Sequence, residues 1–307
     1  MIICGTILYI GKGGAKMYYS PLRYPGGKGK LAPFMELMID KLNLRGGTYI
    51  EPFAGGAGIA LDLLYNGVVG SVVINDWDKA IASFWQAVTR EPNRFIEMIS
   101  NIPITVEEWK KQKEIYDNNA NKCSFELGFA TFYLNRTNRS GIIKGGIIGG
   151  LDQTGEWGID ARFNKDNLIK RIELIKKYQK RIRVYNKDVL SFITHYLPKY
   201  EKNAFVYFDP PYFNKGKELY KNFFSYEDHE NIEEYIAEHV KCSWMITYDY
   251  AEEITRIYDG YAMRQFDLNY SAGTIRKASE LMIFMDEGIC PDEDEVKGIN
   301  INYRKIS

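Results

Sequence analysis

The chain has 307 residues, of which 45% are hydrophobic and 26% charged, so it is long enough to bury the sizeable core of a globular protein. Its 40 basic residues balance its 40 acidic residues, and bulk charge therefore gives no argument for nucleic-acid binding. No apolar stretch approaches the roughly 18 residues that cross a bilayer, and the opening "MIICGTILYIGKGGAK" lacks the features of a signal peptide, so we expect a cytoplasmic protein without a membrane span.

The first clear elements form a βαβ unit. The stretch "GTYIEPF" predicts a strand that ends in a glycine-rich turn, and "GIALDLLYNG" predicts a helix that ends at a glycine. The stretch "SVVIND" then predicts a second strand, which ends in Asp76.

The middle of the chain interrupts this regular pattern. After the helical "DKAIASFWQAV", two helical stretches around 105 to 135 lead into "NRSGIIKGGIIGGLDQTGEWGIDARFN", which contains seven glycines. Glycine-rich polar segments of this kind are typical of hairpins and loops. We interpret this part of the chain as an insertion.

Regular alternation resumes with a helix over 165–180. The elements that follow are the strand "IRVYN", the helix "DVLSFITHYL", the strand "AFVYFD", a helix over 227–239, the strand "CSWMITYD", and two strands near 261–267 and 280–285. Ser225 and Asp228 form a predicted capping box for the helix at 227. The whole pattern predicts an α/β fold with a doubly wound, mostly parallel sheet and one inserted sub-domain.

The stretch "FVYFDPPYFNKG", residues 205–216, ends an apolar strand with an acid and two prolines. Each proline fixes its own φ and keeps the preceding residue out of the helical region, so Asp209 and Pro210 are both expected to be extended. A rigid acid beside an aromatic ring at the carboxyl end of a strand indicates a site, because ligands of open α/β sheets bind there. The simpler alternative is an acid that ends a strand and a tyrosine in a turn.

The glycine-rich turn "EPFAGGAG", residues 51–58, lies between a strand and a helix, where small residues let a ligand approach the backbone. Asp76 follows about twenty residues later, the distance at which an acid can bind ribose hydroxyls. A dinucleotide fingerprint is excluded because its third glycine is missing, and a P-loop because "LRYPGGK" has leucine in place of the first glycine. A nucleoside-bearing cofactor remains, and S-adenosylmethionine fits.

The cysteines and histidines show no spacing typical of a zinc site or a disulfide framework. The four cysteines lie far apart in the sequence, and the three histidines are equally scattered. We therefore expect reduced cysteines and no bound metal.

Five segments in one order carry a resemblance to a known family. They are "RYPGGKGKL", "YIEPFAGGAG", "VVINDWD", "FYLNRTNRSG" and "VYFDPPYF". In this order they resemble the Dam-type family of DNA adenine-N6 methyltransferases, whose target-recognition segment lies between the cofactor motifs and the D-P-P-Y motif. The resemblance implies methyl transfer from S-adenosylmethionine to N6 of a flipped-out adenine in double-stranded DNA, with no metal. It also implies a possible companion restriction endonuclease and no obligatory protein partner.

The resemblance implies a catalytic motif made of Asp209, Pro210, Pro211 and Tyr212. The adenine amine is a poor nucleophile, so a catalyst should accept hydrogen bonds from its N–H groups. Asp209 and the carbonyl of Pro210 are suited to accept them, and Tyr212 offers a ring on which a flipped base can stack. Aspartate at this position favours adenine, since serine is commoner among cytosine-N4 enzymes.

The same resemblance implies a set of cofactor-binding residues. They are Tyr24, Lys28, Glu51, Pro52, Phe53, Ala54, Gly55, Gly56, Asp76, Asp188 and Asp209. The family's F-x-G-x-G becomes Phe53-Ala54-Gly55-Gly56-Ala57 here, which changes individual glycines and keeps the loop. Asp188 has two interpretations: it is either a helix N-cap or a polar residue that faces the adenine of the cofactor.

The resemblance places the DNA-reading segment at "FYLNRTNRSGI". The expected DNA contacts are Asn135, Arg136, Asn138, Arg139, Lys144, Tyr270 and Arg276, with Arg136 as the choice for a phosphate contact. Between Arg136 and Arg183 the chain has 12 basic and 5 acidic residues, which suits a basic face on a neutral protein. Three alternatives stay open: a solvated helix face for the lysines, arginines that only fix a hairpin to the catalytic domain, and a plain hairpin around 270 to 276.

The expected domains follow from these segments. Residues 17–100 and 165–286 would form the catalytic domain, and residues 101–164 the target-recognition insertion. Residues 1–16 and 287–307 would be tails, with Met17 as the expected start. Two other functions remain as alternatives, cytosine-N4 methylation and a non-catalytic DNA-binding relative, although intact Asp209 and Tyr212 argue against the second.

Overall fold

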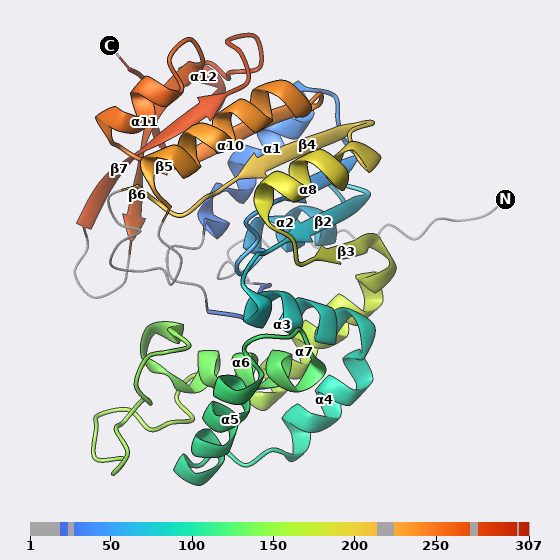
Figure 1. The fold of residues 1–307 in the computed structure, drawn as a ribbon, viewed down its shortest axis with the longest axis vertical. Coiled ribbons are helices and arrows are strands. Elements are labelled where there is room, and N and C mark those ends of the chain that lie inside the picture. Colours follow the sequence, from blue (N-terminus) through green and yellow to red (C-terminus); the bar gives the residue numbers. More distant parts are fainter. Residues whose placement is uncertain (1–18, 24–27, 214–223, 271–275, 300, 307) are drawn as a thin grey trace, which may run out of the picture.

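The structure is a computed structural model, and it describes residues 19–23, 28–213, 224–270, 276–299 and 301–306. One eight-stranded sheet with helices on both faces forms the upper part of the molecule in Figure 1, and a layer of helices lies below it. The expected start at Met17 lies outside the described residues.

The sheet has the strand order β3-β2-β1-β4-β5-β7-β6-β8. The first five strands of this order are parallel, and the last three join as antiparallel neighbours. The strands are β1 (Thr48–Glu51), β2 (Ser71–Asn75), β3 (Ile182–Tyr185), β4 (Ala204–Phe208), β5 (Ser243–Asp249), β6 (Ala262–Tyr270), β7 (Arg276–Phe284) and β8 (Asn302–Lys305). The predicted α/β fold with a mostly parallel sheet is confirmed.

The helices alternate with these strands and also form the inserted layer. They are α1 (Ala32–Lys41), α2 (Gly58–Tyr65), α3 (Lys79–Arg90), α4 (Pro92–Asn101), α5 (Val106–Asn119), α6 (Phe125–Thr137), α7 (Lys165–Tyr178), α8 (Val189–His195), α10 (Tyr226–His239), α11 (Glu252–Ile257) and α12 (Glu293–Val296). Short 3-10 turns occur at Gly29–Leu31, Arg139–Gly141, Gln179–Arg181 and Leu197–Lys199. The predicted capping box of Ser225 and Asp228 is present at the start of α10.

Side chains of the central strand β4 alternate between two hydrophobic layers. Phe205 and Tyr207 pack on one face of the sheet, in the core that also contains α1 and α2. Val206 and Phe208 pack on the other face, in the core that contains α8, α10 and α11. Because both faces of β4 are covered, all five of its residues are buried, which explains its continuous apolar sequence.

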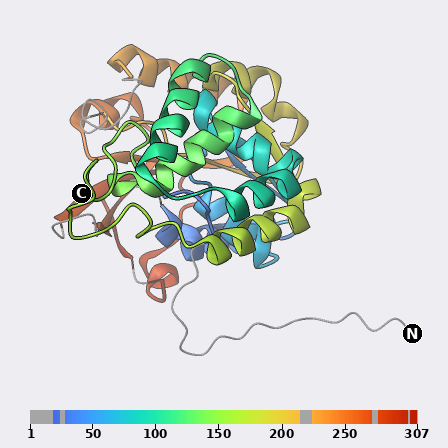
Figure 2. The same cartoon turned by 90° about the horizontal axis from the view of Figure 1, so that it is seen from below.

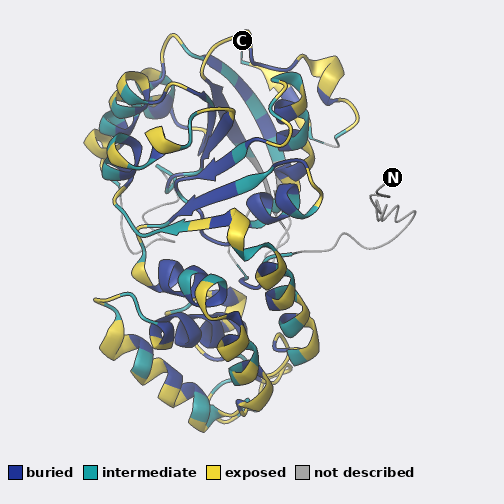
Figure 3. Cartoon of the chain, turned by 90° about the vertical axis from the view of Figure 1, so that its right-hand side faces the viewer, coloured by how far each residue is buried: buried dark blue, intermediate teal, exposed yellow. Residues whose placement is uncertain are grey.

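The helical layer consists of α4 to α7, and α3 joins it to the sheet (Figure 2). Helix α6 packs closely on α3, since a Cβ at Gly128 would lie 2.5 Å from the carbonyl oxygen of Ser83. The rings of Phe95 on α4 and Phe132 on α6, whose centroids are 5.2 Å apart, form an aromatic cluster with Phe84 of α3. In Figure 3 the ribbon of this layer is coloured as buried mainly on the sides that face its interior and as exposed on its outer sides.

Two predicted domain boundaries need correction. Helices α4 and α7 pack against each other within the helical layer, so this layer extends on both sides of the predicted 101–164 segment. The predicted tail 287–307 contains α12 and β8, and β8 pairs with β6 in the sheet. The tail therefore completes the edge of the catalytic sheet.

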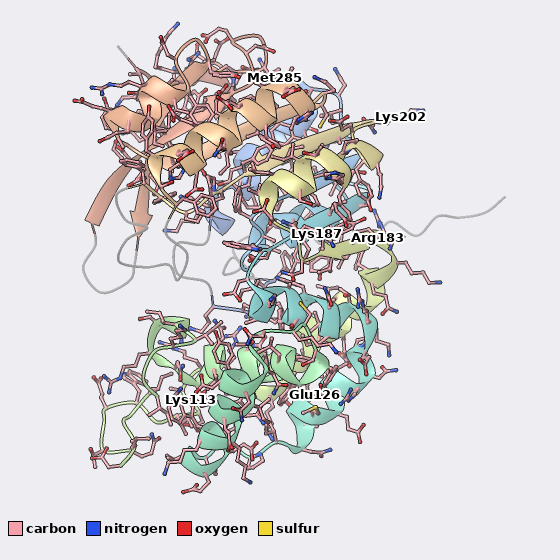
Figure 4. All side chains as sticks on the ribbon, viewed as in Figure 1. Lys113, Glu126, Arg183, Lys187, Lys202 and Met285 are labelled. Carbon is pink, nitrogen blue, oxygen red and sulfur yellow. The ribbon has the colours of Figure 1, made fainter. Side chains whose placement is uncertain are left out.

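The opposite edge of the sheet is β3, and it carries exposed charge. Arg183 is the exposed charged residue of this strand, and Figure 4 labels it together with Lys187, which follows the strand. Charged side chains on an edge strand hinder pairing with another chain.

Candidate active site

The strand order brings the predicted site residues to one edge of the sheet. The glycine-rich turn follows β1, Asp76 follows β2, Asp209 follows β4, and Asp249 ends β5. The chain crosses from β1 to β2 on one side and returns to β4 on the other, so β1 and β4 flank the point where the strand order reverses. Ligands of doubly wound folds bind at this point.

Asp209 leaves β4 with its carboxylate held in place. Its Oδ1 accepts a hydrogen bond of 3.0 Å from the hydroxyl of Thr247, which in turn contacts the hydroxyl of Tyr207 at 2.8 Å. Burial raises the pKa of Asp209 to about 6, and nearby Lys28 opposes this rise while Glu280 adds to it. The carboxylate is therefore mostly ionised at neutral pH and able to accept further hydrogen bonds.

The loop after Asp209 is anchored to the end of β5 by a hydrogen bond. The backbone N–H of Phe213 donates to Oδ1 of Asp249 at 2.9 Å, and Asp249 is 4% exposed. The ring of Phe213 packs on the buried His229, with centroids 5.7 Å apart. This anchoring adds to the restraint that the two prolines impose on the loop.

A buried charged cluster lies against Tyr212. Its hydroxyl donates to Oε2 of Glu280 at 2.7 Å, and the ammonium of Lys28 forms an ion pair with the same oxygen. The Lys28 ammonium also lies 4.6 Å from the centroid of the Tyr212 ring. Lys28, predicted as a cofactor contact, therefore lies beside the catalytic motif.

Sequence reasoning missed Glu280. It is fully buried on β7, where Leu281, Met282, Ile283 and Phe284 follow it as buried apolar residues. An acid next to such an apolar strand is the signal that would have found it, because carboxylates are almost never fully buried unless paired.

The glycine-rich loop is held at both backbone groups of one residue, Gly55. The N–H of Gly55 donates to Oδ2 of Asp76 at 2.8 Å, and the indole N–H of Trp85 donates to the carbonyl of Gly55 at 2.9 Å. The other carboxylate oxygen of Asp76 accepts from the N–H of Asp78 at 2.9 Å. Asp76 therefore shapes the loop in addition to its predicted role toward a ribose.

Burial raises the pKa values of two acids around this loop. The pKa of Asp76 rises to about 7, with Asp78 adding to the effect, and that of Glu51 rises to about 8. Glu51 is buried and accepts from the N–H of Ala60 at 3.2 Å. Acids with raised pKa values cluster at functional sites, where contacts with a bound ligand can offset the free-energy cost of burying them.

The residues around the loop fit a nucleoside. Asp76 is half-buried, and Trp77, which sequence reasoning did not single out, is 51% exposed beside it. A carboxylate can accept from ribose hydroxyls, an exposed indole can stack on a purine, and Gly55 and Gly56 place no side chain in the way. Phe53 packs edge-to-face near Phe224, with centroids 6.2 Å apart.

The remaining predicted cofactor residues differ in their contacts within the protein. The carbonyl of Pro52 accepts from the side chain of Asn75 at 3.0 Å, and Ala54 is buried, so both serve the loop's own packing. Asp188 caps α8 by accepting from the N–H groups of Leu190 and Ser191, which confirms its N-cap interpretation. Its contact with a cofactor stays a prediction, and Tyr24 lies outside the described residues.

Ala57, where the family has its second glycine, adopts φ 44° and ψ 36° at the N-cap of α2. This left-handed conformation costs an alanine roughly 1 kcal/mol or more and costs a glycine almost nothing. We expect Ala57→Gly to raise the free energy of unfolding by about 0.5–1 kcal/mol in urea titrations. The control is Ala237→Gly at an exposed position of α10, which should lower the free energy of unfolding. An Ala57→Gly variant that is less stable than the parent would show that the backbone at Ala57 is not strained.

Three predicted DNA contacts are buried and need correction. Asn135, Arg136 and Asn138 are 2%, 7% and 0% exposed. The Arg136 guanidinium donates to the carbonyl of Pro21, with Nε at 2.7 Å, and Asn135 bonds the backbone of Arg23. The expected phosphate contact of Arg136 does not fit this geometry, which supports the alternative that Arg136 fixes the segment to the catalytic domain.

The buried amide of Asn138 organises the glycine-rich loop after α6. It accepts from the indole N–H of Trp109 at 2.7 Å and donates to the carbonyls of Ile142 and Ile143. Arg139 and Lys144, which lie on this loop, are both exposed. Tyr270 and Arg276 are register partners at the ends of β6 and β7, and their side chains lie outside the described residues.

A sequence profile of D12 class N6 adenine-specific DNA methyltransferases matches residues 24–271. The chain belongs to this family. The methyltransferase is 26% identical over 207 residues to Type II methyltransferase M.MjaIII of Methanocaldococcus jannaschii, a match that covers 62% of the chain and 68% of the relative. It is 24% identical over 207 residues to Type II methyltransferase M1.LlaDCHI of Lactococcus lactis subsp. cremoris, covering 62% and 64%.

A solved structure also matches the methyltransferase. The rRNA methyltransferase aviRa from Streptomyces viridochromogenes matches 85% of this chain with 86% of its own, at a TM-score of 0.34 and 11% identity. Among the described residues no helix has the length and apolar character of a membrane span, and no group of three or more potential metal ligands occurs.

Asp76→Asn should weaken binding of S-adenosylmethionine by about tenfold, the scale of one lost charge-assisted hydrogen bond. A carboxylate accepts hydrogen bonds from ribose hydroxyls more strongly when it is ionised, and the pKa of Asp76 is raised to about 7, so the parent's affinity should fall as the pH drops from 8 to 6. The variant's affinity should change less than the parent's over this range, because it has no carboxyl group at position 76. Calorimetric titrations at both pH values test this, and a parent affinity independent of pH would contradict it.

Proposed function

We propose that this methyltransferase transfers the methyl group of S-adenosylmethionine to N6 of an adenine that is flipped out of double-stranded DNA. The observation that carries the proposal is the position of Asp209 and Pro210 at the sheet edge that also holds the glycine-rich loop and Asp76. The family membership gives the reaction class, and the geometry supports the roles that we propose for these residues.

The proposed role of Asp209 and Pro210 is to accept hydrogen bonds from the adenine amine. The amine's lone pair is delocalised into the ring, so acceptors for its N–H groups favour a more tetrahedral and more nucleophilic nitrogen. Asp209 is held by Thr247 and the loop by Asp249, which means that the acceptors are oriented before substrate arrives. Such preorganised electrostatic groups are usually the largest contribution of an enzyme to the rate.

Tyr212 is the proposed stacking surface for the flipped base. A duplex hides the target nitrogen, and enzymes that modify a base turn it out and stack it between aromatic or apolar side chains. The ring of Tyr212 is half-buried and held at its hydroxyl by Glu280. A ring restrained in this way loses little freedom when a base stacks on it.

S-adenosylmethionine, when bound, supplies the electrophilic methyl group. We propose that Asp76 binds the ribose of the cofactor, and that Gly55 and Gly56 let the cofactor approach the backbone of the loop. Asp188 and Trp77 are the proposed contacts of its adenine. Arg139 and Lys144 are the proposed DNA contacts, and the similarity to Type II methyltransferases favours a companion restriction endonuclease.

The test is incubation of the purified protein with S-adenosylmethionine and duplex DNA, followed by nucleoside analysis by mass spectrometry. N6-methyladenine is expected, and Asp209→Asn should form it about 10²- to 10³-fold more slowly. N4-methylcytosine would replace the proposal by the cytosine alternative. DNA binding without any methyl transfer would support the non-catalytic alternative.

A further inference from the structure

Two acids on neighbouring strands hold successive residues of the D-P-P-Y loop. Asp249 on β5 and Glu280 on β7 are partners in the antiparallel register of these strands. Asp249 accepts from the backbone of Phe213, and Glu280 accepts from the side chain of Tyr212. The sheet therefore presents one carboxylate for the backbone of the loop and one for its aromatic ring.

The Lys28–Glu280 pair is buried more deeply than stability alone explains. The two side chains are 3% and 0% exposed. Taking two charges out of water costs several kcal/mol per ion, and well-packed apolar residues often replace such pairs without loss of stability. The four residues that follow Glu280 on β7 are apolar and buried, so an apolar side chain would suit the strand equally well. A role toward the site is the simpler reason for an acid here.

We propose that Glu280 is a positioning residue for methyl transfer, which holds the Tyr212 hydroxyl and the Lys28 ammonium on one carboxylate oxygen and so fixes the ring beside Asp209. The proposal rests on the proposed function of Tyr212 and extends it to a residue outside the D-P-P-Y motif. Lys28 contributes from two sides, because it neutralises Glu280 and lies against the Tyr212 ring at 4.6 Å.

The ion pair with Glu280 also bears on the charge that Lys28 presents to Asp209. The charge of Lys28 already acts on Asp209, as its opposing effect on the Asp209 pKa shows. Without the Glu280 carboxylate, the buried ammonium would be drawn toward Asp209. An aspartate engaged by an ammonium is a weaker acceptor for the adenine amine, so loss of Glu280 should impair the chemical step and leave ligand binding intact.

The experiment is a double-mutant cycle with Glu280→Gln and Tyr212→Phe. Tyr212→Phe keeps the ring and removes only the hydroxyl that Glu280 holds. Single-turnover methylation with saturating S-adenosylmethionine and a defined duplex gives the chemical rate, and titrations give both affinities. We expect each variant to lower the chemical rate by about tenfold, and the double variant by little more than the stronger single change, because groups that act through one contact are not additive. The affinities for cofactor and DNA should stay within about threefold of the parent.

The matched control is Glu287→Gln. Glu287 also forms an ion pair, with Arg264, but it is exposed and lies beyond the end of β7, so its loss should leave methylation unchanged. Additive effects in the cycle, or a fully active Glu280→Gln variant, would overturn the proposal. Should Glu280→Gln fail to fold, Tyr212→Phe decides alone, since a fully active Tyr212→Phe variant would show that the held hydroxyl has no role. A parent that transfers no methyl group would instead refute the proposed function itself.

Discussion

Asp209→Asn is expected to lower the turnover number by about 10²- to 10³-fold, the scale seen when one preorganised group is removed from a transition state. The asparagine side chain keeps the shape of aspartate and loses its charge. Thr247 donates to one carboxylate oxygen, so an amide oriented to accept this bond would turn its NH2 group toward the N–H groups of the adenine. Two donors then face each other where the parent has a donor and an acceptor.

The measurement is single-turnover methylation at saturating concentrations of both substrates. Affinity for S-adenosylmethionine should change by less than about threefold, because the interaction proposed for Asp209 is with the target base. Asp259→Asn is the control, since Asp259 is an exposed acid after α11, far along the chain from the D-P-P-Y loop. Turnover of Asp209→Asn close to that of the parent would remove Asp209 from the catalytic assignment.

The fold was predictable where the sequence has one dominant pattern. The parallel strands β1 to β5 are short apolar runs bounded by turn residues, and each lies within one or two residues of its expected position. Strand β8 escaped prediction because it is a polar edge strand, in which only Tyr303 is buried. A strand that buries one side chain resembles a loop in the sequence, and only its pairing with β6 identifies it.

The local part of the site was predictable for the same reason. Asp76 and Asp209 follow strands directly, so the sequence alone places them at the carboxyl edge of the sheet. Glu280 lies 252 residues from Lys28, and no local pattern reports a contact over such a separation. Long-range pairs of this kind depend on the strand order, which becomes known only with the fold.

The burial of Arg136 shows a second limit of local patterns. Arginine is expected on a surface, and a basic residue beside two asparagines indicates nucleic-acid contact. Helix α6, however, packs against both α3 and α5, and its residues from Leu127 to Thr137 are buried on every side. Arg136, on this helix, therefore donates to the backbone carbonyl of Pro21 and does not extend into solvent. Of the two arginines predicted to contact DNA in this segment, only Arg139, on the loop after α6, is exposed.

Arg139→Ala should weaken DNA binding, and the form of the loss identifies its contact. If the guanidinium binds a guanine edge, the loss should be about 1–3 kcal/mol and preference at one base pair should relax. If it binds a phosphate, affinity should fall equally on all sequences and the dependence on log salt should decrease by about one ion. Among the described residues Arg139 is exposed and forms no ion pair, which leaves its charge available for either contact.

Binding and methylation on a panel of substituted sites at two salt concentrations distinguish these cases. Arg183→Ala is the matched control, because Arg183 is also exposed but lies on the edge strand β3 (Figure 4). Arg136→Ala should instead lower the free energy of unfolding by about 1–3 kcal/mol, since the buried carbonyl of Pro21 loses its donors. An Arg139→Ala variant that binds and methylates every site as the parent does, with the same salt dependence, would show that the loop after α6 does not read DNA through this side chain.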